Sequence, residues 1–278
     1  MITRKNDAFL YRFDECNKDW EQYFLLISDV HFDSLKCDRR LLKSHLDEAL
    51  EVNARILIFG DWFDCMGGKY DPRTTKADIR PEYQTQTYFD DIVDDSARFL
   101  APYSKNIDMI SEGNHETSVK LRHEIDLLSE LSKRGLCNYL SCYKGKYNGF
   151  IRFQFARNGG HRTSKIMYYT HGGGGGAPVT RGAIKSNRRQ DAVIADFYVA
   201  GHIHTEFEML RPQQTINEQC NLVYKKTHHY QLGTYKNDFM DGGWADHKEH
   251  APASLGGRWL KFYGSSLNLK FRSYLTNS

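Results

Sequence analysis

No long apolar run occurs in this sequence of 278 residues. No stretch approaches the roughly 18 consecutive apolar residues that a helix needs to cross a bilayer. The first twenty residues, MITRKNDAFLYRFDECNKDW, also lack the apolar core of a secretory signal peptide. The sequence therefore predicts a cytoplasmic protein that does not have a membrane as a partner.

Paired cysteines and a strong excess of one charge are missing as well. The six cysteines, at positions 16, 37, 65, 137, 142 and 220, are scattered and form no C-x-x-C motif. Such a pattern favours free thiols in a reducing compartment over a disulfide framework. The 38 Lys and Arg residues against 35 Asp and Glu give a net charge of only +3. That charge is too small to indicate nucleic-acid binding by itself.

Low-complexity segments and repeats of fixed period are absent too. What the sequence does contain is material for a core, since 40% of its residues are hydrophobic and 13% are aromatic. This composition is typical of a globular protein. Because no linker divides the chain, we expect a single domain over residues 1–278, with a β-rich C-terminal part from about residue 205.

The first half alternates short apolar runs with amphipathic segments, a pattern that predicts parallel β-α-β units. In the last of the expected helices, Leu121, Ile125, Leu128 and Leu131 should form one buried stripe. The expected strands are 23–28, 55–60 and 106–113, and the expected helices are 38–52, 82–101 and 116–134.

The second half is rich in strand patterns separated by turn residues. An α/β half followed by a β-rich half predicts an α/β fold, a two-sheet αββα sandwich of mixed sheets flanked by helices. We expect the segment from residue 205 onward to close the second sheet. The expected strands are 149–155, 164–170, 196–200, 221–231, 258–264 and 267–274, with one helix near 182–191.

Five short polar motifs follow five of the expected strands. In open α/β sheets, ligands collect at the carboxyl ends of the strands, so these five points should converge in space. The motifs are D-V-H from Asp29, G-D-W-F-D from Gly60, G-N-H-E from Gly113, H-G at His171 and G-H-I-H from Gly201.

The side chains of these motifs suit divalent metal ions. They are carboxylates, imidazoles and one amide, without a thiolate cluster, and such ligands bind Mn, Fe, Zn and similar ions. Asp29 and His31 are two residues apart just after a strand, as are His202 and His204, so a turn can aim both members of each pair inward. Asp61 follows the middle strand of the first three. Its two oxygens can bridge a pair of metals about 3.5–4 Å apart, the separation used in phosphoryl chemistry.

Each motif alone has an ordinary structural explanation. A D-x-H triplet often occurs in a turn, and an Asp after a strand commonly caps the next helix. G-N-H-E can be a simple turn, and G-H-I-H can be a pair of core histidines. Five motifs in order, each after an expected strand, favour a metal site over five separate coincidences.

The set resembles the calcineurin-like metallophosphoesterase superfamily, whose pattern is D-x-H, G-D-x-x-D, G-N-H-[DE], a later His and G-H-x-H. The resemblance covers about residues 23–206. It implies that His115 lies beside the substrate, where it stabilises the transition state or protonates the leaving oxygen. It implies that Asp64 orients that histidine or the residues around the metals. The implied first metal has the ligands Asp29, His31, Asp61 and His204, and the second has Asp61, Asn114, His171 and His202.

The implied activity is hydrolysis of a phosphate ester with two divalent metal ions as cofactors, Mn first and Fe, Zn, Ni or Mg as alternatives. The metals activate a water that attacks phosphorus in line. Phosphoprotein phosphatases resemble this pattern but place an Arg two positions after G-N-H-E, where this chain continues Thr117-Ser118. They also have a single late histidine in place of G-H-x-H. Both differences favour phosphodiesters, as in the exonuclease-like and cyclic-nucleotide branches, over phosphomonoesters or phosphoproteins.

Basic residues on two segments near the expected site are candidates for substrate contacts. Arg73 lies in segment 65–81, and Arg181 and Arg188 lie in segment 178–190. Such side chains can bind a substrate phosphate or a nucleic-acid backbone, which makes nucleic acid a candidate partner. The alternative is a solvated basic surface. The sequence leaves the oligomeric state open.

Five consecutive glycines, 172–176, follow His171. Expected metal ligands on both sides of the run exclude a flexible linker, and no G-K-[ST] follows as in a P-loop. We expect the run to let the backbone pass close to the metals and the substrate without Cβ atoms in the way.

The alternative to an enzyme is a non-catalytic scaffold that keeps the fold for protein binding. Such scaffolds tend to lose metal ligands or the histidine of G-N-H-E, and this chain retains all of them. The sequence therefore favours a hydrolase.

Overall fold

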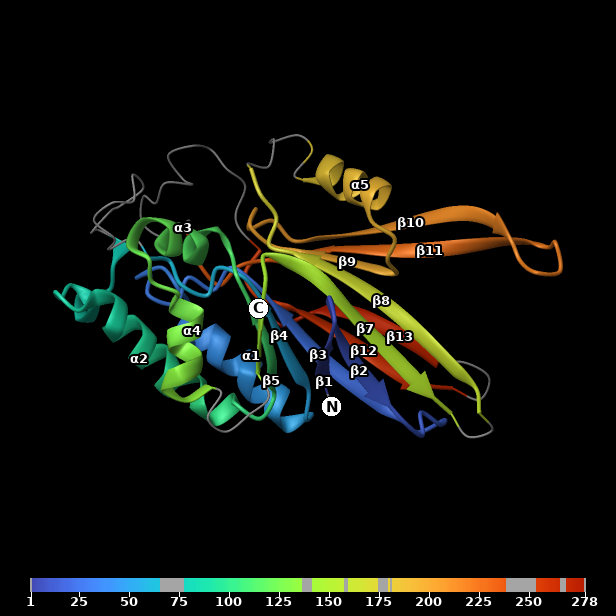
Figure 1. Ribbon diagram of the computed structural model, residues 1–278, viewed down its shortest axis with the longest axis horizontal. Helices are drawn as coiled ribbons and strands as arrows, with labels where there is room; N and C mark the ends of the chain where they lie inside the picture. Colours follow the sequence, from blue (N-terminus) through green and yellow to red (C-terminus); the bar gives the residue numbers. More distant parts are fainter. Residues whose placement is uncertain are drawn as a thin grey trace.

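Two β-sheets packed face to face form the centre of the protein in the computed structural model (Figure 1). Both sheets contain parallel and antiparallel pairs, and helices lie on their outer sides. The mixed two-sheet αββα sandwich expected from the sequence is therefore confirmed. The structure describes residues 2–65, 78–136, 142–157, 160–174, 180, 182–238, 254–265 and 269–277.

The six-stranded sheet contains the β-α-β units that the first half predicts. Its strands β3, β4, β5 and β6 are parallel neighbours, whereas β12 joins β3 in the antiparallel sense. The parallel strands therefore end at the same edge of the sheet. The order is β13 (Leu269–Leu275), β12 (Arg258–Gly264), β3 (Glu21–Ile27), β4 (Arg55–Phe59), β5 (Ile107–Ser111) and β6 (Tyr143–Gly145).

The seven-stranded sheet is assembled from both ends of the chain. Within it β8 and β9 are parallel, so Thr170 and Ala200 end side by side. The hairpin of β1 and β2 at the N-terminus was not expected from the sequence. The order is β1 (Ile2–Lys5), β2 (Ala8–Phe13), β7 (Asn148–Ala156), β8 (Arg162–Thr170), β9 (Phe197–Ala200), β11 (Leu222–Gln231) and β10 (Phe207–Ile216).

From the sequence we expected the strands after residue 205 to close the second sheet. This expectation is wrong, because these strands are divided between the two sheets. β10 and β11 extend the seven-stranded sheet, whereas β12 and β13 extend the six-stranded one. In Figure 1 the hairpin of β10 and β11 projects away from the rest of the molecule. The chain therefore crosses from one sheet to the other between β11 and β12.

Four helices cover the outer face of the six-stranded sheet. They are α1 (Arg39–Glu51), α2 (Tyr88–Leu100), α3 (Asn114–His123) and α4 (Leu127–Leu131), and they share one apolar cluster with β3 and β4. Asp38 caps α1 by accepting hydrogen bonds from the backbone of Arg40 and Leu41. On the other sheet, α5 (Ala183–Ala192) is held by hydrogen bonds from Arg211 to Asn187 and from Thr227 to Gln190. No helix in the described ranges is long and apolar enough to span a membrane.

The single helix expected over 116–134 is wrong, because the chain breaks after α3. Glu124 has a left-handed backbone with φ 59°, and Asp126 then caps α4 by accepting a hydrogen bond from the amide of Ser129. The apolar stripe expected on this helix is interrupted at the same place. Leu121 is 83% exposed, whereas Leu128 and Leu131 are buried.

A second apolar cluster fills the space between the two sheets, and much of it is aromatic. The ring of Phe153 stacks on Tyr11 at 5.3 Å and meets Phe24 edge-on at 5.2 Å. Burial of each such side chain stabilises the fold by about 1.5–3 kcal/mol. This core fixes the two sheets against each other and thereby places their strand ends together.

Candidate metal centre

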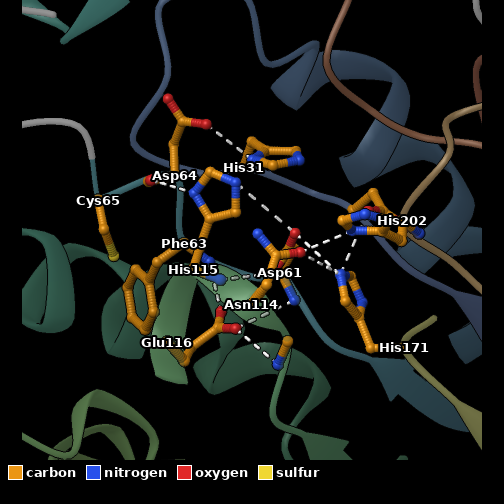
Figure 2. Close-up of polar contacts among 12 residues, drawn as sticks. His31, Asp61, Phe63, Asp64, Cys65, Asn114, His115, Glu116, His171 and His202 are labelled. Atoms are coloured by element: carbon orange, nitrogen blue, oxygen red, sulfur yellow. Dashed lines mark hydrogen bonds and ion pairs between the residues drawn. The ribbon is translucent and has the colours of Figure 1, made fainter. Parts of the chain in front are cut away.

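The five polar motifs meet at one end of the sandwich, beyond the carboxyl ends of five strands. Asp29 and His31 follow β3, and Asp61 follows β4. Asn114 is the first residue of α3, after β5. From the other sheet, His171 follows β8, and the G-H-I-H histidines follow β9. Figure 2 shows how His31, Asp61, Asn114, His171 and His202, which come from distant parts of the chain, face one another.

Asp29, His31 and His204 form the first group of side chains that can hold a metal. The Nε2 atoms of the two histidines are 3.1 Å apart, and Nε2 of His204 is 3.3 Å from Oδ1 of Asp29. Asp29 and His31 are buried, whereas the side chain of His204 is 22% exposed. Two imidazole nitrogens and one carboxylate oxygen aimed at one point are a suitable ligand set for a divalent cation.

Asp61, His171 and His202 form the second group. Nε2 of His171 is 3.0 Å from Oδ2 of Asp61 and 3.0 Å from Oδ1 of Asn114. The same amide oxygen is 2.7 Å from Nδ1 of His202. The groups adjoin, because Nε2 of His171 is also 3.9 Å from Oδ1 of Asp29. The structure thus brings together all seven side chains that the sequence proposes as metal ligands, in two neighbouring groups.

The backbone at these ligands is strained. Five of them lie in the left-handed region, which residues other than glycine rarely adopt. Each such residue costs about 1–3 kcal/mol and persists where the surroundings hold it, typically at a functional site. The values of φ are 53° for Asp29, 51° for His31, 50° for Asp61, 80° for His202 and 53° for His204.

Two motif glycines are required by close approach. A Cβ atom on Gly113 would overlap Oδ1 of Asp61, and one on Gly201 would overlap Oδ2 of Asp29. Each contact involves a carboxylate of a proposed ligand. The glycines of G-N-H-E and G-H-I-H therefore provide the space that these two carboxylates occupy.

Asp64 contacts His115, the histidine that the resemblance expects it to orient, and also the proposed ligand His31. Its Oδ1 is 2.7 Å from Nδ1 of His31, and its backbone carbonyl accepts a hydrogen bond from Nδ1 of His115. His115 in turn places Nε2 3.8 Å from Oδ2 of Asp61, with its ring edge-on to His31 at 4.8 Å. The carboxylate of Asp64 therefore orients a proposed metal ligand, and its carbonyl orients His115 (Figure 2).

The charges of the centre support cation binding. Burial alone would raise the pKa of Asp61, but His171 and His115 hold that pKa well below its usual value. Burial lowers the pKa of His171, but the carboxylates of Asp61 and Asp29 outweigh it and raise the pKa to about 10. Without a metal, His171 therefore carries a proton that two carboxylates hold. A divalent cation would displace that proton and take over its charge.

His31 is already in the form that a metal needs. Burial lowers its pKa to about 4, and this effect outweighs the neighbouring Asp64. At neutral pH the ring is uncharged. With Nδ1 facing Asp64, the Nε2 lone pair is free to bind a cation. The donor types, the strained backbone and these charge states together fit a pair of divalent ions.

Two buried carboxylates that the sequence analysis did not single out brace the loops. Glu116 accepts hydrogen bonds from the amides of Asp61 at 3.1 Å, Phe63 at 3.0 Å and Gly113 at 2.9 Å. Asp33 accepts from the amides of Asp64 at 2.6 Å and Cys65 at 3.0 Å. Both residues could have been proposed from the sequence, because Glu116 is the last residue of G-N-H-E and Asp33 lies two residues after His31.

Of the three arginines proposed to bind substrate, Arg73 and Arg181 lie outside the described residues. Arg188 is exposed on α5. Its neighbour Arg189 comes closer to the glycine run, with a guanidinium nitrogen 3.8 Å from where a Cβ of Gly172 would be.

The glycine run has different environments along its described part. Gly172 has φ 101°, and its carbonyl accepts a hydrogen bond of 2.5 Å from the hydroxyl of Tyr147. A Cβ on Gly172 would be 3.1 Å from the carbonyl oxygen of Gly201, whereas one on Gly173 would meet nothing within 4 Å. The ammonium of Lys185 donates to the carbonyl of Gly174 at 2.7 Å. Gly175 and Gly176 lie outside the described residues. Close packing is thus a property of Gly172, and Gly173 is open.

Neither the protein-family models nor the curated proteins gave a match to this sequence. The comparison with solved structures gave matches. The chain is similar to Vps29 of Chaetomium thermophilum at 9% identity, over 91% of this chain and 87% of that one, with a TM-score of 0.39. A metallophosphoesterase from Sphaerobacter thermophilus is 15% identical over 91% of this chain and 88% of that one, with a TM-score of 0.37. A Thermotoga maritima protein solved by NMR is 14% identical over 92% and 99%, with a TM-score of 0.33. These likenesses concern the fold.

Proposed function

We propose that the protein is a hydrolase that uses two divalent metal ions to cleave phosphate esters, with phosphodiesters as the preferred class. The observation that carries the proposal is the convergence of seven ligand-type side chains from five strand ends into two adjoining groups. Asp61 lies in the second group, and the proposal assigns to it the role of the carboxylate that would serve both ions.

Two ions bound here would supply an activated water and charge stabilisation at the phosphoryl oxygens. The protein's own residues would position the groups that contact the substrate. Nδ1 of His115 donates to the carbonyl of Asp64, so its Nε2 faces the centre. From there Nε2 can hold a proton against a phosphoryl oxygen or pass it to the leaving oxygen.

The exposure of the ligands indicates the side from which a substrate arrives. Asp29, His31, Asp61 and His171 are buried, whereas Asn114, His202 and His204 are half-buried. A phosphate group therefore approaches over the G-H-I-H turn and the start of α3. The preference for diesters is supported by the sequence at that place, since Thr117 and Ser118 follow G-N-H-E and no arginine is there to hold a dianionic monoester.

A panel of phosphate esters tests the proposal. The protein loaded with Mn²⁺ is incubated with bis-p-nitrophenyl phosphate, p-nitrophenyl phosphate, single-stranded DNA and cyclic nucleotides. We expect diester hydrolysis that a chelator abolishes and added Mn²⁺ restores. If DNA is cut, the rate should fall steeply with salt, because phosphate contacts release counterions. Hydrolysis of the monoester alone would refute the diester preference, and no hydrolysis of any ester would favour a non-catalytic scaffold.

A further inference from the structure

The segment 234–238, which we name the strap, leaves the seven-stranded sheet after β11 and crosses the first group of ligands. Its sequence is TYKND. It lies outside the motifs of the superfamily that the sequence resembles, and nothing in its local sequence marks it as part of a metal site. Its contacts reach all three residues of the first group.

Asp29 is held through its backbone. The hydroxyl of Thr234 donates to the carbonyl of Asp29 at 2.7 Å, and the amide of Tyr235 donates to the same oxygen at 3.0 Å. This residue has a left-handed backbone. Two hydrogen bonds to its carbonyl are the kind of surrounding contact that keeps such a conformation in place.

His31 is held through Asp64 and Lys236. The ammonium of Lys236 donates to Oδ1 of Asp64 at 2.9 Å, and the same oxygen is 2.7 Å from Nδ1 of His31. Lys236 is 8% exposed and Asp64 only 1%. The result is a buried row of three groups, in which Lys236 neutralises the carboxylate that orients the ligand.

Lys236 also opposes a repulsion. The carboxylate of Asp33 is buried and accepts hydrogen bonds from the amides of Asp64 and Cys65, so a second negative charge lies beside Asp64. Without the ammonium, two buried carboxylates would repel each other with no lysine cation at Asp64. The carboxylate of Asp64 would then turn away, and His31 would lose its orientation.

The end of the strap approaches the third residue of the group. Oδ2 of Asp238 is 3.9 Å from Nδ1 of His204, and its Oδ1 is 3.8 Å from the ammonium of Lys36. The strap is itself fixed on two sides. The amide of Asp38 donates to the carbonyl of Tyr235 at 2.8 Å, and the amide of Thr234 donates to Ser254 at 3.0 Å.

We propose that Lys236 is a positioning residue for the first metal ion, the one that Asp29, His31 and His204 would bind, and that it acts through Asp64 on His31. The proposal rests on the proposed function, because it needs metal binding at these two groups. It concerns the first ion, because the hydrogen bonds and ion pairs described above connect the strap to all three residues of the first group.

Metal stoichiometry tests the proposal without relying on activity. Wild type, Lys236→Met and Lys236→Arg are titrated with Mn²⁺, and the spin coupling of neighbouring Mn²⁺ ions is followed by electron paramagnetic resonance. We expect two ions in wild type. In Lys236→Met the affinity of one site should fall by about 10–100-fold, the usual effect of removing a group that orients a ligand, and the spin coupling should disappear. Lys236→Arg keeps the cation and should retain both ions.

Further variants assign the loss to one site. In a His202→Ala background, which removes a ligand of the second group, Lys236→Met should abolish the remaining tight binding. In a His204→Ala background, Lys236→Met should change the remaining binding little. Lys43→Met is the matched control, because Lys43 is an exposed lysine paired with Asp47 on α1. Thermal melting in chelator checks that each variant folds.

The outcomes separate this proposal from the proposed function. Equal loss of both ions, unchanged binding in Lys236→Met, or a loss in Lys236→Arg as large as in Lys236→Met would each overturn the positioning role. A wild type that binds two ions but hydrolyses no phosphate ester would refute the proposed function. The Mn²⁺ titrations of the Lys236 variants would then still decide whether Lys236 positions the first ion. A wild type that binds no divalent ion would refute both.

Discussion

Asp61 and His115 show how differently two neighbouring side chains can serve the same centre. Asp61 is buried beside His171, and its Oδ1 also accepts the amide hydrogen of His115 at 3.0 Å. His115 instead makes its closest polar contact with a backbone carbonyl and only approaches the ligand groups with Nε2. One residue therefore belongs to the proposed metal ligands, and the other borders them.

Substitutions at these residues should separate metal binding from turnover. Asp61→Ala should lose both the metals and the activity, because no other carboxylate in the second group faces His171. His115→Ala should keep two metals and lower kcat by about 10²–10⁴-fold, the range for removal of a general acid or base. Steady-state kinetics and metal analysis of the purified variants make the comparison. Full activity in Asp61→Ala would contradict the assignment of the site.

At the scale of elements, loops that follow strands carry the ligands, and these loops are tied to one another. The amide of Asp29 donates to Gly60, that of His31 donates to Asp61, and that of Gly201 donates to His171. The amide of His202 donates to the carboxylate of Asp29. Each loop is thus braced by a loop from another strand, and the contact between His202 and Asp29 joins the two sheets.

Gly173, in the described part of the glycine run, is a place where space remains for a side chain. Gly173 is exposed, and a Cβ there would meet no heavy atom within 4 Å. Gly173→Val should therefore leave the melting temperature nearly unchanged. If the run borders the substrate, the valine should lower kcat/KM by about tenfold or more, since small misplacements of substrate have large effects on rate. Gly173→Ala should have a smaller effect. Wild-type kinetics in the valine variant would show that the run is only a loop.

The sequence predicted the elements whose signals are local. Apolar runs identified β3, β4 and β5 with their parallel order, and the polar residues just after them identified the ligands. The helix break at Glu124 was missed, because the apolar spacing of Leu121 and Leu128 continues across it. β1 was missed because it is short and polar residues such as Arg4 and Lys5 interrupt its apolar pattern, and its partner β2 was missed with it. Lys236 was missed because its partner Asp64 is 172 residues away in the chain.

On the scale of the whole molecule, the candidate metal centre joins the two sheets. Asp29, Asp61 and Asn114 come from the six-stranded sheet, and His171, His202 and His204 come from the seven-stranded one. An ion held between them binds the folded chain and not the unfolded one. It therefore stabilises the entire fold by mass action, by about 2.7 kcal/mol at a hundredfold excess over Kd.

Removal of metal should therefore lower the melting temperature by several degrees, and the effect should depend on pH. In the metal-free protein, burial lowers the pKa of His171, but Asp61 and Asp29 raise it from 6.5 to about 10. The protonated ring then stabilises the fold fully below pH 6.5, and this contribution is lost as the pH rises through 10. Metal competes with that proton, so the shift in melting temperature on adding Mn²⁺ should grow between pH 6 and pH 9.

Thermal melts with Mn²⁺ or chelator across this pH range measure the effect, with Asp61→Ala as the variant that should not respond. Calorimetry in buffers of different ionisation enthalpy should show proton release when Mn²⁺ binds. A metal-induced shift that is independent of pH would contradict the displacement of a proton from His171.

The strap also sets the order in which the protein matures. Thr234 lies 205 residues after the carbonyl of Asp29 that it holds. During synthesis, all seven candidate ligands are therefore made before the segment that fixes the first of them. A nascent chain that stops after His204 carries every ligand and still cannot fix Asp29 or orient His31 as the finished protein does. Metal binding at the proposed centre would consequently be a late step, and a bound pair of ions would report that the C-terminal strands have folded into both sheets.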